Sequence, residues 1–169
     1  MHVLTFPAQH KFWSLDDEGG LGGLHHDFLS LKSGLKLHYI KNTCEFSATK
    51  LIVCLHGFPD SCLIYQNILR SSKLQSTGVQ LVAIDLPGCG GSEDFERYGA
   101  GEILNGVAEA IALLKSQYLA DDAAECILVG HDWGGIIAYR IAAETSGLVN
   151  RVVSINTAYV GISVEHTKV

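Results

Sequence analysis

The residues with the clearest chemical potential lie in the stretch ILVGHDWGGIIAYRIAAE, residues 127 to 144. An apolar run typical of a strand leads through a glycine-bearing turn into an apolar run typical of a helix. Asp132 stands at the turn, between Gly130 and Gly134. An elbow of this kind, with small residues around it, holds a nucleophile above the sheet, and that nucleophile is usually serine. The sequence therefore predicts a nucleophile with a carboxylate in place of the hydroxyl.

A carboxylate nucleophile selects the kind of carbon that is attacked. A serine alkoxide that attacks a saturated carbon leaves an ether, which water does not cleave. A carboxylate leaves an ester, whose carbonyl carbon water can attack. The start of the following helix favours negative charge, so we expect Asp132 to be ionised. The alternative is that Asp132 only caps the helix of residues 133–146; Trp133 and the flanking glycines favour the nucleophile.

The elements that must position this turn are strands alternating with helices. Two short alternating runs around Ser33-Gly34 predict a hairpin over residues 27–40. Apolar residues at helical spacing predict a helix from Ile103 to Tyr118, whereas residues 61–70 give a short, ambiguous signal. Continuous apolar runs predict strands buried on both faces of a parallel sheet at residues 50–55, 79–88, 125–130 and 151–156.

This order predicts an α/β fold with a mainly parallel sheet and helices on both faces. Ligands of such sheets bind beyond the carboxyl ends of the strands. The segments HGFPD, DLPGCGGS and GHDWGG all begin at predicted strand ends, so we expect them to meet at one edge. Residues 1–26 lack periodicity and predict a loose N-terminal segment, with the domain in residues 27–169.

Length and composition favour a single domain and exclude some functions. The chain has 169 residues and a formal net charge of -6, which argues against nucleic-acid binding. No apolar run approaches the roughly 18 residues that a membrane span needs. The first residues lack the basic and apolar regions of a signal peptide. We therefore expect neither a membrane span nor secretion.

The five cysteines show no metal-binding or disulfide pattern. Cys54 and Cys126 lie in apolar runs and are expected to be buried thiols, which favours a reducing, cytoplasmic location. His25 and His26 follow GGLGG and are expected in a solvated loop rather than at a metal site. The sequence thus predicts no metal and no cofactor.

In its motifs the chain resembles the N-terminal half of an α/β-hydrolase of the epoxide hydrolase and haloalkane dehalogenase branch. The motifs are LHGFPDS, DLPGCGGSED, ILVGHDWGGIIAY and RVVSINTAY, in the order and spacing of that branch. The resemblance implies that Asp132 forms a covalent ester with a small apolar substrate, which water activated by a histidine then hydrolyses.

The resemblance also assigns residues around the ester. It implies that the backbone N–H groups of Phe58 and Trp133 form the oxyanion hole. His56, Gly57, Pro59, Gly130 and Gly134 would support these loops, with His56 structural rather than a base. Asp85 and Ser92 are expected to be turn residues.

An epoxide is the favoured substrate and an alkyl halide the alternative. HGFP is usual in epoxide hydrolases, whereas many haloalkane dehalogenases place Asn or Glu after His-Gly. One dehalogenase subgroup carries its acid at the end of the fourth strand, where this chain has Asn156. Trp133 occurs in both groups.

The resemblance further implies a core truncated before the cap and the C-terminal strands. The cap tyrosines, the acid and the histidine of the family follow residue 160. The chain alone is therefore expected to lack turnover and to self-associate through the edge of the strand at 151–156. A catalytically incomplete fragment or binding module is the remaining alternative.

Overall fold

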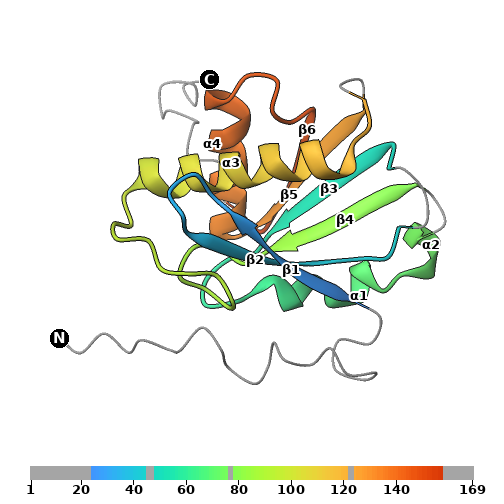
Figure 1. The fold of residues 1–169 in the computed structure, drawn as a ribbon, viewed down its shortest axis with the longest axis horizontal. Coiled ribbons are helices and arrows are strands. Elements are labelled where there is room, and N and C mark those ends of the chain that lie inside the picture. The colour runs from blue at the N-terminus through green and yellow to red at the C-terminus, as the bar shows by residue number, and fades with distance from the viewer. Residues whose placement is uncertain (1–23, 45–47, 76–77, 122–123, 158–169) are drawn as a thin grey trace, which may run out of the picture.

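The computed structural model describes residues 24–44, 48–75, 78–121 and 124–157. A six-stranded sheet runs through them in the order β1-β2-β4-β3-β5-β6 (Figure 1). The strands are β1 (His25–Ser30), β2 (Lys36–Lys41), β3 (Lys50–Leu55), β4 (Val79–Ile84), β5 (Glu125–His131) and β6 (Arg151–Ile155). The helices are η1 (Cys62–Tyr65), α1 (Gln66–Leu69), α2 (Ser72–Gln75), α3 (Ala100–Tyr118) and α4 (Trp133–Glu144).

Strand pairing confirms the predicted mainly parallel sheet. β1 and β2 form an antiparallel hairpin around Gly34, and β2 pairs antiparallel with β4. β3 pairs parallel with both β4 and β5, and β5 pairs parallel with β6. The carboxyl ends of β3, β4 and β5 therefore lie side by side, as expected for the three glycine-bearing loops.

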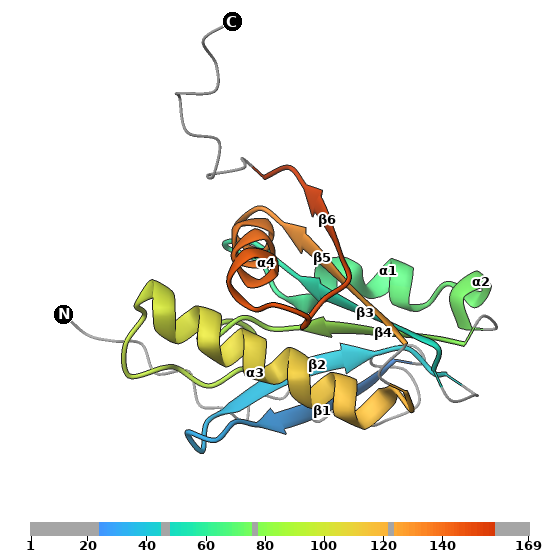
Figure 2. The ribbon, with the colours of Figure 1, turned by 90° about the horizontal axis from the view of Figure 1, so that it is seen from above.

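Helices cover both faces of the sheet, as Figure 2 shows. On one face α3 and α4 pack on side chains such as Leu51, Val53 and Leu55. On the other face η1 and α1 pack on Cys54, Leu81 and Ala83. Successive residues of β3 thus enter different cores, because side chains alternate along a strand. This explains why the run at 50–55 is apolar without alternation.

The hairpin begins earlier than the sequence suggested. His25 and His26 were expected in a solvated loop, but they open β1, where they pair with Lys41 and Ile40 of β2. Their backbone groups find partners on β2, and this outweighs the weak strand signal of two adjacent histidines. The glycines before them, like the rest of residues 1–23, lie outside the described residues.

The ambiguous segment at 61–70 resolves into two short helical pieces. Ser61 caps η1, its side chain accepting a hydrogen bond from the Leu63 N–H at 3.4 Å. α1 follows directly, and Leu69 enters the second core. In the part of the chain that the structure describes, no helix is long and apolar enough to cross a membrane.

Candidate active site

Asp132 occupies a strained elbow between β5 and α4. Its φ of 52° and ψ of -119° lie in a region that residues with a side chain rarely adopt. The Asp132 N–H donates to the carbonyl of Ile155 at 3.2 Å, and the Thr157 hydroxyl donates to the Asp132 carbonyl at 3.0 Å. Asp132 stands at the N-cap position of α4, but its side chain makes no capping hydrogen bond, which argues against the alternative that it only caps the helix.

Glycines make the close approach of strand and helix possible. A Cβ on Gly130 would overlap the backbone of Gly134 and lie 2.5 Å from the Cα of Gly135. A Cβ on Gly134 would lie 2.6 Å from the carbonyl oxygen of His56. Because real side chains do not tolerate such distances from backbone atoms, Gly130 and Gly134 are required by the packing of β5, α4 and the end of β3.

Two backbone amides stabilise the Asp132 carboxylate. The Phe58 N–H donates to Asp132 Oδ1 at 3.1 Å. Hydrogen bonds from the N–H groups of Trp133 and then Phe58 hold the pKa of Asp132 below its usual value. The carboxylate is partly exposed and ionised at neutral pH. A carboxylate that is charged, accessible and held by two donors is prepared to attack an electrophile.

An apolar pocket of about 490 Å³ lies next to this elbow, although Asp132 itself is not among the residues that line it. Two exposed aromatic side chains, Phe58 and Trp133, form part of its wall, together with Tyr98. The other lining residues are Gly57, Leu86, Pro87, Gly88, Cys89, Ile103 and Ile137. The pocket therefore suits a small apolar molecule.

His56 is buried below the oxyanion loop. Its Nδ1 lies 2.7 Å from the Gly57 carbonyl, and its Nε2 accepts a hydrogen bond from the Leu86 N–H at 3.0 Å. Nε2 is thus an acceptor, and Nδ1 carries the proton and donates it to Gly57. Both ring nitrogens are occupied by backbone groups. This geometry supports the structural interpretation of His56. Pro59 follows Phe58 through a cis peptide bond and is exposed.

Asp85 is not the simple turn residue that the sequence suggested. It is fully buried after β4, and its carboxylate accepts hydrogen bonds from the Cys62 N–H at 2.6 Å and the Gly91 N–H at 2.9 Å. His38 Nδ1 of β2 lies 2.8 Å from Asp85 Oδ2. Burial raises the pKa of Asp85, but the hydrogen bonds, first that from His38, outweigh it and leave the pKa below its usual value. Ser92 is a turn residue as predicted, its hydroxyl donating to the Asp85 carbonyl at 2.7 Å.

Among the described residues, His38, Cys62 and Asp85 form one group whose potential metal-ligand atoms all lie within 4.8 Å of one another. The His38 nitrogen and the Asp85 oxygens already take part in the hydrogen bonds above. Burial, then the charge of Asp85, raises the pKa of the Cys62 thiol, which keeps it protonated. These contacts describe a hydrogen-bonded cluster, and the absence of a metal stays a prediction.

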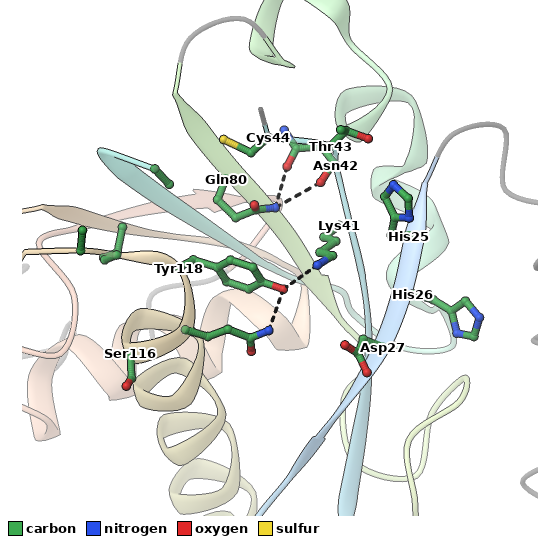
Figure 3. Close-up of a pocket in the computed structure, with 14 residues that line it drawn as sticks. His25, His26, Asp27, Lys41, Asn42, Thr43, Cys44, Gln80, Ser116 and Tyr118 are labelled. Atoms are coloured by element: carbon green, nitrogen blue, oxygen red, sulfur yellow. Dashed lines mark hydrogen bonds between the residues drawn. The ribbon is translucent and has the colours of Figure 1, made fainter. Parts of the chain in front are cut away.

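A second pocket lies at the opposite end of the sheet, at the amino ends of β3 and β4 (Figure 3). Here Lys41 reaches from β2 to α3, where its Nζ donates to the Tyr118 hydroxyl at 3.0 Å. Gln80 donates to Asn42 Oδ1 at 2.8 Å. Polar side chains that line this second pocket thus form hydrogen bonds with one another. This distinguishes the second pocket from the apolar pocket next to the elbow.

The structure confirms the predicted burial of two cysteine thiols. Cys126 is buried in the core under α3 and α4, and Cys54 is buried in the core under η1 and α1, as predicted. Burial raises the pKa of Cys54 to about 12 and that of Cys126 to about 11. Neither thiol is a nucleophile at neutral pH.

Comparison with known proteins identifies the relatives of this architecture. A model described as the alpha/beta hydrolase family matches residues 52–165. Epoxide hydrolase 3 of Xenopus tropicalis is 30% identical over 138 residues, which cover 79% of this chain and 34% of that protein. Epoxide hydrolase 4 of Mus musculus is 29% identical over 142 residues, covering 83% of this chain and 37% of that protein. A solved mutant epoxide hydrolase of Vigna radiata gives a TM-score of 0.64 at 26% identity, covering 78% of this chain and 38% of that chain.

The chain spans about a third of the length of the curated relatives it matches. The match to the family model nevertheless includes most of the chain, from β3 through the elbow and past β6. Together with the mainly parallel sheet and the strained turn at Asp132, this match shows that the chain belongs to the alpha/beta hydrolase family.

Proposed function

We propose that this chain carries the nucleophilic half of an epoxide hydrolase, with Asp132 as the residue that opens the epoxide. The observation that carries the proposal is the ionised Asp132 carboxylate, held at a strained elbow by the Phe58 N–H beside an apolar pocket. Aligned relatives named epoxide hydrolases support the choice of reaction.

In the first step a carboxylate oxygen of Asp132 attacks a ring carbon of the epoxide. The carbon–oxygen bond of the ring breaks, and the leaving oxygen takes a proton from solvent water to become a hydroxyl. The product of this step is a hydroxyalkyl ester of Asp132. An apolar pocket favours the reaction, because it removes the hydration shell that would weaken the nucleophile.

In the second step water attacks the carbonyl carbon of this ester. Negative charge develops on the carbonyl oxygen of the Asp132 ester, and the Phe58 N–H already donates to one oxygen of this carboxylate. Donors fixed in advance stabilise such an oxyanion without reorganisation. Collapse of the intermediate releases a diol and restores the carboxylate. By family resemblance, the histidine that activates the water belongs to the part of the protein beyond the described residues.

The halide alternative shares the first step, with a halide ion as leaving group. The Phe-Pro pair after His56-Gly57 and the absence of an acid at Asn156 favour the epoxide. Asn156 lies directly after β6, is exposed and has a φ of 50°. A carboxamide there cannot orient a protonated histidine as a carboxylate would.

Mass spectrometry can test both the nucleophile and the leaving group. The protein is incubated with an aryl epoxide or a matched alkyl bromide and then digested. Ring opening adds the whole epoxide to the Asp132 peptide, whereas displacement adds the alkyl group without bromine. Asp132→Asn should carry no adduct, and Asp60→Asn, an exposed loop control, should behave as wild type. Adducts elsewhere, or turnover that survives Asp132→Ala, would refute the nucleophile.

The outer edge of β6 supports the further proposal that the chain self-associates. Val153 is 47% exposed and Ile155 is 40% exposed on this strand. Exposed apolar edge strands pair with other chains. Size-exclusion chromatography should show oligomers that shift to monomer on Val153→Lys, and a monodisperse wild-type monomer would contradict this.

A cytoplasmic location likewise stays a prediction, which imaging of the tagged protein in cells tests.

A further inference from the structure

We propose that Asp85 is a positioning residue for the reaction, because its buried carboxylate fixes both loops that form the wall of the apolar pocket. The inference rests on the proposed function of Asp132 but concerns a different residue. Asp85 follows β4, on the other side of β3 from the elbow. It is fully buried and touches neither the pocket nor the nucleophile in any described contact.

The first loop fixed by Asp85 is the one that carries the oxyanion donor. This loop runs from His56 at the end of β3 to Cys62 at the start of η1, and Gly57 and Phe58 line the pocket. The Cys62 N–H donates to Asp85 Oδ1 at 2.6 Å. The C-terminal end of the loop is therefore anchored in the interior by a charge-assisted hydrogen bond, which is stronger than one between neutral groups.

The second loop is the glycine turn that follows Asp85 itself. Leu86, Pro87, Gly88 and Cys89 line the opposite part of the pocket. The turn closes where the Gly91 N–H donates to Asp85 Oδ2 at 2.9 Å. Gly90 has a φ of 53°, and a Cβ on it would overlap the Asp85 carboxylate. The turn thus wraps the carboxylate closely.

Hydrogen bonds through the His56 side chain also join the two loops beside the Asp85 carboxylate. The Leu86 N–H donates to His56 Nε2 at 3.0 Å, and His56 Nδ1 in turn contacts the Gly57 carbonyl at 2.7 Å. Phe58, whose N–H donates to Asp132, is the next residue. A displacement of Asp85 would therefore reach the oxyanion donor along two routes, through Cys62 and through His56.

His38 fixes the orientation of the Asp85 carboxylate from β2. Its Nδ1 lies 2.8 Å from Oδ2, and both side chains are completely buried. A carboxylate with two oxygens is needed to accept from Cys62 on one oxygen and from Gly91 and His38 on the other. An asparagine in its place presents an N–H to one of these amide donors, so it must release one of the two loops.

The experiment compares Asp85→Asn with two variants of its partner, His38→Asn and His38→Leu. Asparagine at position 38 keeps a donor near the place of Nδ1, whereas leucine removes it. A fourth variant, Ile111→Val on α3, serves as a control that weakens the core away from the loops. All are first compared by thermal unfolding, so that effects are judged at known stability.

Two readouts report position without relying on catalysis. Carbon-13 NMR measures the pKa of Asp132, and amide hydrogen exchange measures protection at Phe58, Cys62 and Gly91. We expect Asp85→Asn and His38→Leu to raise the pKa of Asp132 and to expose at least one loop amide. His38→Asn should restore both towards wild type, and Ile111→Val should change neither. The proposal would be overturned if Asp85→Asn kept the wild-type pKa of Asp132 and the wild-type amide protection. It would also be overturned if Ile111→Val shifted both quantities as much as Asp85→Asn does. If Asp85→Asn does not fold, the contrast between His38→Asn and His38→Leu decides in the same way.

The rate of ester formation from the epoxide in a single turnover then separates this proposal from the proposed function. A moved Phe58 amide should slow the step roughly tenfold or more, since small displacements of positioned groups have such effects. If the NMR and exchange changes appear but no ester forms on Asp132 even in wild type, the proposed function fails while the positioning role stands. If ester forms at the wild-type rate in Asp85→Asn, Asp85 is only structural.

Discussion

The ends of β4 and β5 carry two aspartates in contrasting environments. Asp132 and Asp85 both follow parallel strands that flank β3, and both accept hydrogen bonds from backbone N–H groups. Both have a pKa below the usual value. Asp132 is partly exposed in a strained conformation beside an apolar pocket, whereas Asp85 is sealed between β2, η1 and the glycine turn. The same residue type at equivalent strand ends is thus accessible at one end and buried at the other, which supports different proposed roles for the two carboxylates.

The largest contrast is expected when each aspartate is replaced by alanine. Asp85→Ala removes the acceptor of the Cys62 and Gly91 N–H groups and the buried carboxylate that His38 contacts. Removing one member of a buried pair costs about 3–5 kcal/mol of unfolding free energy. Asp132→Ala should change it by less than about 0.5 kcal/mol, as at exposed sites. Urea unfolding checks both, with Glu96→Ala as an exposed control. Equal losses for the two aspartates would contradict the comparison.

The second prediction concerns the loop that faces Asp132. Gly57→Val should slow ester hydrolysis about 10²–10³-fold, the cost of losing one oxyanion donor. The reason is that a Cβ on Gly57 would lie 2.5 Å from the Asp132 Cβ and 2.8 Å from its Cγ. Phe58→Ala keeps the donor N–H and removes a side chain that is 76% exposed, so its effect should be smaller. Stopped-flow measurement of full-length variants tests this, and negligible effects of both changes would refute the placement.

The third prediction uses the pH dependence of stability. The pKa of Asp85 in the folded protein is below its value of 3.8 in the unfolded chain. Its contribution to stability is therefore complete above that unfolded value and is lost as the pH falls through the lower folded pKa. Denaturant midpoints measured between pH 7 and pH 2 should fall at the acid end in wild type and less steeply in Asp85→Asn. Parallel curves would show that other carboxylates dominate.

The smallest expected effect is a gain of stability at the elbow. Asp132→Gly should raise the unfolding free energy by about 1 kcal/mol, because glycine adopts a positive φ without the strain that costs other residues about 1–3 kcal/mol. The same change at Asp60, an exposed loop residue outside the positive-φ positions, should lower it. Chemical unfolding of the two variants makes the comparison. A loss in both would mean that the elbow stores no strain.

Sequence reasoning was most successful where one physical signal was sufficient. The continuous apolar runs predicted β3, β4 and β5, since a strand covered on both faces carries few polar side chains, and they also located β6 at the end of the sheet order. Strand β3 was predicted to the residue. The strand boundaries were predicted less well where backbone pairing outweighed the preferences of the side chains. His25 and His26, expected in a loop, pair with β2 as the first residues of β1.

In the candidate site, the local motif indicated the elbow but not the network behind it. His38 stands among apolar residues in LHYI, which is a sign of burial, yet nothing nearby in sequence shows its partner. Asp85 lies 47 residues away, and their contact depends on the pairing of β2 with β4. Thr157 was missed for the same reason, because its hydrogen bond to Asp132 spans 25 residues.

The sequence by itself determined the parallel strands, the glycines of the elbow and the carboxylate at its centre. These features depend on side-chain type and on spacing within a few residues, which a linear pattern records. Tertiary structure decided the positive φ of Asp132, the approach of the Phe58 amide and the burial of Asp85. Each of these arises where loops from different strands meet. The environments that leave one aspartate accessible and bury the other therefore exist only in the folded chain.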